Sequence, residues 1–143
     1  MTEHFSLREL TRSFVADIRK INNAPSQEAK DNLKMLAQNV LEPLRAKFGA
    51  PLYVSSGFRS EALNKAVKGA KNSQHLFGQA ADLIACAGAG ESKKQANKRL
   101  FNVARQMIES GEITVGQLID EKNFAWVHVS LPTERLKNQI LHL

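Results

Sequence analysis

Three polar residues interrupt segments whose patterns otherwise predict regular structure. His75 precedes a Leu-Phe-Gly sequence, Asp82 lies within the apolar run 80–84, and His128 lies within the run 126–130. A carboxylate in a buried strand costs several kcal/mol unless it is paired, hydrogen-bonded or bound to a metal. Two histidines and one aspartate that meet at one point form a three-ligand set for a catalytic metal, with a fourth position open to water. Without a thiolate, this set favours zinc and also accommodates other divalent ions.

Residue types alone leave other roles open. A single histidine in a strand is more often a core or surface residue than a ligand, and Asp82 could instead cap a helix or pair with Arg59. From residue type and spacing alone, it is therefore a hypothesis that His75, Asp82 and His128 bind a metal.

The segments that must position these residues alternate between helical and extended patterns. Ser6 and Glu9 have the spacing of a capping box, which predicts a short helix from Ser6. Apolar residues from Gln27 onward follow a helical period, and Pro43 is expected to kink that helix or start a new one, which ends at Gly49. Further helices are expected over 61–67, from about 92 to 111, and over 132–143. In the last of these, Leu136, Ile140 and Leu143 would face inward. Strands are expected over 52–55, 80–84, 117–121 and 126–130.

Helices that precede a small sheet with a hairpin indicate an α+β fold rather than an alternating α/β unit. We expect a small antiparallel sheet that carries the metal site and packs against N-terminal and central helices. The chain has 143 residues, 43% of them hydrophobic and 24% charged, which suits one domain over 1–143. Within it we expect a helical N-terminal part (1–50), a metal-site core (51–131) and a C-terminal tail or helix (132–143).

The charge balance limits the partners. A net charge of +6 and a sequence pI near 9.7 indicate an anionic partner, such as nucleic acid, a membrane surface or a cell-wall polymer. No apolar run approaches the roughly 18 residues of a membrane span, and the N-terminus lacks a secretory signal. The sequence therefore predicts synthesis in the cytoplasm with no integral membrane segment. The single cysteine, Cys86, excludes an intramolecular disulfide.

The short sequence motifs around the three polar residues resemble those of a known family. They are Ser56-Gly-Phe-Arg-Ser60, Ser73-Gln-His-Leu-Phe-Gly-Gln-Ala-Ala-Asp-Leu83 and Trp126-Val-His-Val-Ser130. They resemble the zinc D-alanyl-D-alanine carboxypeptidases, which share their fold with the hedgehog signalling domain, and most closely the short phage and prophage members. The resemblance runs from Phe5 to about Ser130. It implies that His75, Asp82 and His128 bind one zinc ion.

A metallopeptidase also needs a general base that takes a proton from water and passes it to the leaving amine. Many members of that family place an acid three residues before the last histidine, where this chain has Ala125. Asp120 and Glu121 are the candidates. A four-residue turn over 122–125 would put Glu121 opposite Trp126, on the sheet face of His128, with Asp120 pointing away. A register shifted by one residue would reverse the choice, and the resemblance of Gln-Leu-Ile-x-Glu to close family members favours Glu121. An exposed turn acid without a role is the alternative.

Other residues near the motifs are candidates for contact with substrate. In the family the equivalent of Arg59 looks like a ligand for a substrate carboxylate or oxyanion, although Arg59 could instead orient Asp82. Ser73 could bind substrate or hold its loop, and Trp126 could line the cleft or pack in the core. Lys65, Lys68 and Lys71 could attract an anionic wall polymer or form an ordinary solvated surface.

The resemblance thus implies a zinc metallopeptidase that hydrolyses peptidoglycan stem peptides, as carboxypeptidase or endopeptidase, and we expect it to be a monomer. The resemblance implies a bacteriophage or prophage enzyme such as an endolysin, which reaches the cell wall after release or as a virion component. A non-catalytic metal-binding or virion component of the same fold is the alternative, favoured by Ala125. Nucleic acid is not an expected partner, because no basic helix with interleaved aromatic residues supports it.

Overall fold

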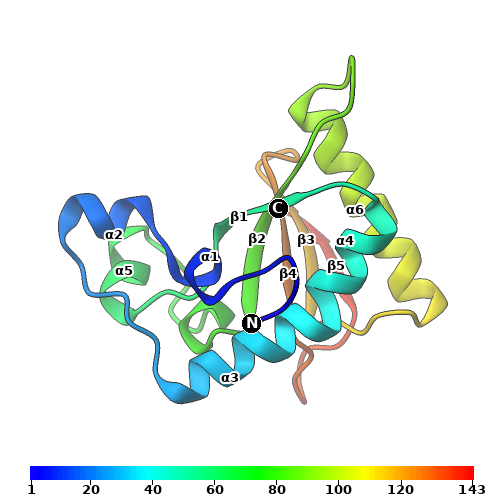
Figure 1. The fold of residues 1–143 in the computed structure, drawn as a ribbon. Coiled ribbons are helices and arrows are strands. Elements are labelled where there is room, and N and C mark those ends of the chain that lie inside the picture. Colours follow the sequence, from blue (N-terminus) through cyan, green and yellow to red (C-terminus); the bar gives the residue numbers. More distant parts are fainter.

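The computed structural model describes residues 1–143 and confirms the α+β class (Figure 1). The helices are α1 (Leu7–Thr11), α2 (Phe14–Arg19), α3 (Gln27–Leu36), the π-helical turn η1 (Ala37–Leu41), α4 (Glu42–Phe48), α5 (Glu61–Ala66), the 3-10 turn η2 (Gln74–Phe77) and α6 (Lys93–Ser110). The strands are β1 (Leu52–Ser56), β2 (Ala80–Ala85), β3 (Gln117–Glu121), β4 (Trp126–Ser130) and β5 (Gln139–His142). No helix combines the length and the apolar composition that a membrane span requires.

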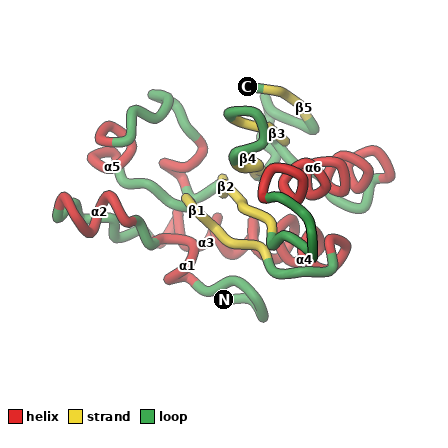
Figure 2. Tube along the Cα trace, turned by 90° about the horizontal axis from the view of Figure 1, so that it is seen from above, coloured by secondary structure: helices red, strands yellow, loops and turns green.

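The strands form one sheet in the order β1-β2-β4-β3-β5. The first three neighbouring pairs are antiparallel, and β3 and β5 are parallel. Seen from above, α4 and α6 lie on one side of the sheet and α5 lies on the other (Figure 2). The sheet therefore separates a helix-covered face from a second face bordered by the α5 region.

Alternation along the strands sends apolar side chains to the helix-covered face. Leu83 of β2, Leu118 of β3 and Val127 of β4 belong to a cluster of 28 buried hydrophobic residues that also includes residues of α3, α4 and α6. Because successive side chains in a strand point to opposite faces, their polar neighbours must point to the other face. The packing of the core thus fixes which face carries Asp82 and His128.

Local signals explain the helix boundaries. Ser6 Oγ accepts a hydrogen bond from the Glu9 amide at 3.1 Å, and Ser92 with Gln95 forms a complete capping box at the start of α6. Pro43 lies in the first turn of α4 but does not start a separate helix. The helical path is unbroken before it, because η1 places the Glu42 amide on the carbonyl of Ala37.

The prediction of a helix within 132–143 is wrong. Residues 139–142 form β5, which pairs with β3 so that Ile140 lies beside Leu118. The spacing of Leu136, Ile140 and Leu143 fits a helix, but the free edge of β3 offers backbone hydrogen bonds that no local pattern reveals. Asn138, which has a left-handed backbone, turns the chain into this position, and its side chain accepts a hydrogen bond from the Val115 amide at 2.9 Å.

Candidate metal centre

A row of paired residues crosses four strands on the face away from the core. Ser56 of β1 pairs with Asp82 of β2, Asp82 pairs with His128 of β4, and His128 pairs with Ile119 of β3. Paired residues point to the same side of a sheet, so Asp82 and His128 must meet. Two of the three predicted residues are therefore brought together by strand register alone.

His75 reaches the same point from η2, just before β2. Its Nδ1 lies 2.7 Å from the Gly57 carbonyl oxygen, and its own carbonyl accepts a hydrogen bond from the Arg59 amide at 3.0 Å. A Cβ on Gly57 would lie 2.2 Å from the Leu10 carbonyl oxygen, so only glycine permits this approach to α1. The Ser-Gly-Phe-Arg segment thus holds His75 by its backbone.

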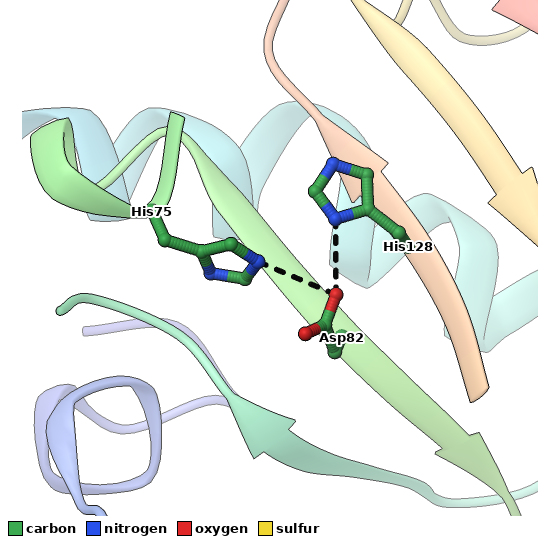
Figure 3. A group of neighbouring side chains, drawn as sticks. All are labelled: His75, Asp82 and His128. Carbon is green, nitrogen blue, oxygen red and sulfur yellow. Dashed lines mark hydrogen bonds and ion pairs between the residues drawn. The ribbon is translucent and has the colours of Figure 1, made fainter. Parts of the chain in front are cut away.

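The three side chains converge in a buried cluster (Figure 3). His128 Nδ1 lies 2.9 Å and His75 Nε2 lies 3.3 Å from Asp82 Oδ1. The exposed fractions are 3% for His75, 5% for Asp82 and 8% for His128. Donor atoms 2.0–2.1 Å from a tetrahedral ion lie about 3.3 Å from one another, so these separations are close to those a zinc site needs.

The hydrogen bond to Gly57 supports a cation in this cluster. A carbonyl only accepts, so Nδ1 of His75 must carry the proton, and in the neutral ring Nε2 is then a lone pair. In the neutral ring that lone pair would face the Asp82 carboxylate at 3.3 Å, and two acceptors at this distance repel unless a metal ion lies between them or a second proton makes the ring itself a cation that donates to Asp82. The donor set, the tautomer and the burial therefore fit a bound divalent metal.

Arg59 supports Asp82 from the opposite side. Its Nη2 lies 3.4 Å from Asp82 Oδ2, its Nε donates to Ser56 Oγ at 3.0 Å, and its Nη1 donates to Asn64 Oδ1 at 3.2 Å. Burial alone would raise the pKa of Asp82, but hydrogen bonds from His128 and His75 outweigh burial and hold this pKa well below its usual range. The carboxylate is thus kept ionised, with Oδ2 toward Arg59 and Oδ1 toward the histidines.

Glu121 and Asp120 lie on opposite faces of β3. The predicted register is confirmed: Leu118 pairs with Val129 and Glu121 pairs with Trp126. Glu121 lines the pocket and accepts a hydrogen bond from Trp126 Nε1 at 2.5 Å. Asp120 is buried, and its carboxylate binds the His142 ring instead.

The His75–Asp82–His128 cluster opens into a pocket of about 630 Å³. Its lining includes all three cluster residues together with Arg59, Ser73, Glu121 and Trp126, so the structure brings every predicted site residue to one cavity. Ser73 Oγ accepts a hydrogen bond from the His75 amide at 3.2 Å, so Ser73 holds its own loop, which is one of its two expected roles. Of the three lysines near the motif, Lys68 lines the pocket, and Lys65 and Lys71 do not.

Asn97 of α6 is a supporting residue that sequence reasoning missed. It is fully buried, accepts a hydrogen bond from the Ala85 amide at 2.8 Å, and donates to the carbonyls of Phe124 and Ala125 at 2.9 and 3.1 Å. These bonds hold a hairpin turn in which three successive non-glycine residues, 122–124, have left-handed backbones. A polar residue at an apolar position of a helical stripe is the only signal that could have pointed to it.

The fold and the buried His-Asp-His cluster thus define an α+β protein with a site that could hold a metal beside an open pocket. The family model of Peptidase M15 matches residues 3–130, which is most of the chain. The chain belongs to the Peptidase M15 family, whose members are zinc-dependent, and this membership supports a zinc-dependent peptidase. A comparison with curated proteins gives no significant match.

Proposed function

We propose that this protein is a zinc peptidase that hydrolyses peptide bonds in peptidoglycan stem peptides. The observation that carries the proposal is the buried His75–Asp82–His128 cluster, which opens into a pocket that also holds an acid, Glu121. Membership of the Peptidase M15 family supports the same reaction class.

In this proposal His75 Nε2, Asp82 Oδ1 and His128 Nδ1 hold the zinc ion. Gly57 fixes the ring of His75, and Arg59 fixes the carboxylate of Asp82, so the donors are oriented before the metal binds. When bound, zinc would polarise the scissile carbonyl and lower the pKa of a water molecule.

Glu121 is the proposed general base. Its Oε2 is occupied by Trp126 Nε1, which leaves Oε1 free to take a proton from water and pass it to the leaving amine. Trp126 is then a positioning residue as well as part of the pocket wall. Ala125, at the position where many family members carry an acid, lies in the hairpin turn.

The proposed substrate contacts are Arg59, Ser73 and Trp126. Arg59 lies in the pocket, but its three donor nitrogens already face Ser56, Asn64 and Asp82, so orientation of Asp82 is its better supported role.

The net charge of +6 suits an anionic wall polymer, and we propose that the protein acts on the cell wall as a phage or prophage lytic enzyme.

Turbidity loss of chloroform-treated Gram-negative cells tests the proposal. We expect wild type and Glu109→Gln, an exposed α6 control, to clear the suspension, while Glu121→Gln does so about 100-fold or more slowly. Metal content should be one zinc per chain in all three proteins. Equal clearing by Glu121→Gln would contradict its role as base.

A non-catalytic metal-binding role is the second candidate, and Ala125 is the observation that favours it. In that case all three proteins would bind zinc but none would clear the suspension. The same experiment therefore separates the two functions.

A further inference from the structure

The outward face of α2 is apolar, which is unusual for a surface helix. Phe14 is 79% exposed and Ile18 is 64% exposed, whereas Ala16 between them is 4% exposed. At 100° per residue, Phe14 and Ile18 each lie within about 20° of the direction opposite Ala16. The two largest apolar side chains of this helix thus stand together at the centre of its solvent face.

Neither side chain contributes to the core. Phe14 and Ile18 belong neither to the hydrophobic cluster nor to the partly buried residues packed against it. Their exposure therefore brings no stability to the isolated chain, and paired exposed apolar residues are informative where single ones are not.

Basic residues outnumber acidic ones in α2 and in the neighbouring α5 region. We define the basic lobe as α2 with its flanking residues, 12–20, together with α5 and the loop after it, 61–72. The lobe carries six exposed basic residues and only two acidic ones: Arg12, Arg19, Lys20, Lys65, Lys68 and Lys71 against Asp17 and Glu61. None of the six forms an ion pair, although Arg12 stacks on the Tyr53 ring.

The two parts of the lobe lie side by side at one end of the molecule (Figures 1 and 2). Asn23, in the loop after α2, links them, because its Oδ1 accepts from the Ser60 amide at 2.7 Å and its Nδ2 donates to the Phe58 carbonyl at 3.1 Å. Lys68 of the same lobe lines the pocket into which the His75–Asp82–His128 cluster opens. The lobe therefore borders the mouth of the candidate active site.

We propose that the basic lobe docks on an anionic lipid bilayer, with Phe14 and Ile18 entering the interface. Unpaired lysines and arginines complement anionic headgroups, and an aromatic and an aliphatic side chain can enter the acyl boundary between them. A soluble anionic polymer would use the charges but not the apolar pair. Two side chains on a six-residue helix are too small a patch for a stable protein interface. Docking would hold the pocket mouth close to the bilayer.

Co-sedimentation with lipid vesicles tests this proposal without any peptidase assay. We expect the protein to bind vesicles of equal parts phosphatidylglycerol and phosphatidylcholine, to bind less as salt is raised, and to leave pure phosphatidylcholine unbound. The double variant Phe14→Ser/Ile18→Ser should lower the partition coefficient about tenfold or more, and so should Arg19→Gln/Lys20→Gln.

Matched controls separate the lobe from general charge and apolarity. Met35→Ser removes a half-exposed apolar side chain on α3, and Lys93→Gln/Lys94→Gln removes two charges at the start of α6, away from α2 (Figure 1). Both should bind vesicles as wild type does. All variants should keep the far-ultraviolet circular dichroism of wild type, because the altered side chains are exposed.

Three outcomes would overturn the proposal. They are equal binding to neutral and anionic vesicles, unchanged binding of the Phe14→Ser/Ile18→Ser variant, and a concentration-dependent wild-type dimer that this variant abolishes. The last outcome would assign the face to a second copy of the chain. A protein that binds vesicles but cleaves no wall peptide would leave this proposal standing and refute the proposed function.

Discussion

At the scale of single residues, hydrogen bonds fix the orientation of the side chains in the site. His75 cannot turn its ring because Gly57 holds Nδ1, and Asp82 cannot turn its carboxylate because Arg59 holds Oδ2. Glu121 is held by Trp126 through one oxygen only. His75, Asp82 and Glu121 are thus each fixed by a partner that leaves one atom free.

Replacing Arg59 tests its role beside Asp82. Arg59→Gln should raise the zinc dissociation constant about 10- to 100-fold, because loss of a partner behind a metal ligand lowers metal affinity by this amount. Competition with a fluorescent zinc chelator measures it. Arg99→Gln, which breaks an exposed ion pair with Glu91, is the control and should bind zinc as wild type does. Wild-type zinc affinity in Arg59→Gln, combined with lost activity, would instead assign Arg59 to substrate.

At the scale of elements, close backbone contacts hold the segment that carries His75. Gly78 ends η2 with a φ of +70°, and a Cβ there would lie 2.4 Å from the Ala29 carbonyl oxygen of α3. Gly90 has a similar φ of +74° but open space around it. The two glycines therefore share a backbone requirement and differ in packing.

Comparing alanine at these two positions isolates the packing. Gly78→Ala should lower the free energy of unfolding by about 1–3 kcal/mol more than Gly90→Ala does, because both pay for a left-handed backbone but only Gly78→Ala pushes η2 away from α3. Urea denaturation gives both values. Equal losses would mean that the contact with Ala29 does not constrain the His75 segment.

The hairpin between β3 and β4 depends on α6 through Asn97. Asn97→Leu should lower the free energy of unfolding by about 1–3 kcal/mol, because it leaves the buried Ala85 amide without an acceptor. It should also lower kcat more than KM changes, since the turn it releases directly follows Glu121. Gln106→Leu, at an exposed position of the same helix, is the control for both measurements. Unchanged kcat in a folded Asn97→Leu protein would separate the turn from catalysis.

At the scale of the whole molecule, metal binding should add to a fold that the core already supports. Free zinc at about 1,000 times its dissociation constant should add about 4 kcal/mol to the free energy of unfolding and raise Tm by about 10 °C. Differential scanning calorimetry with zinc and with magnesium measures this, and magnesium should give no shift because it disfavours nitrogen ligands. His75→Ala should abolish the zinc shift; a full shift in that variant would place the ion elsewhere.

Much of the site could be predicted from the sequence because its residues break local patterns. Asp82 and His128 are polar residues in apolar strands, and alternation with period two fixed the face that each occupies. The position of Glu121 followed from the length of the hairpin turn. These are short-range properties, which a sequence displays directly.

The rest depended on contacts between distant segments. Strand β5 was missed because the sequence of 139–142 does not reveal its pairing with the distant strand β3. Asn97 was missed because its hydrogen-bond partners are 12 to 28 residues away. The roles of Gly57 and Gly78 depend on backbones from α1 and α3. The exposed pair on α2 also emerged only once the buried face of that helix was known.

Mass spectrometry of purified peptidoglycan peptides incubated with the protein tests the central claim most directly. We predict cleaved stem peptides with the zinc-loaded protein, none after chelation, and recovery when zinc is added back. The mass of the products would also distinguish carboxypeptidase from endopeptidase cleavage. Intact peptides with the zinc-loaded protein, or cleavage that persists in the fully chelated protein, would contradict the claim that the His75–Asp82–His128 cluster is the metal centre of a wall peptidase.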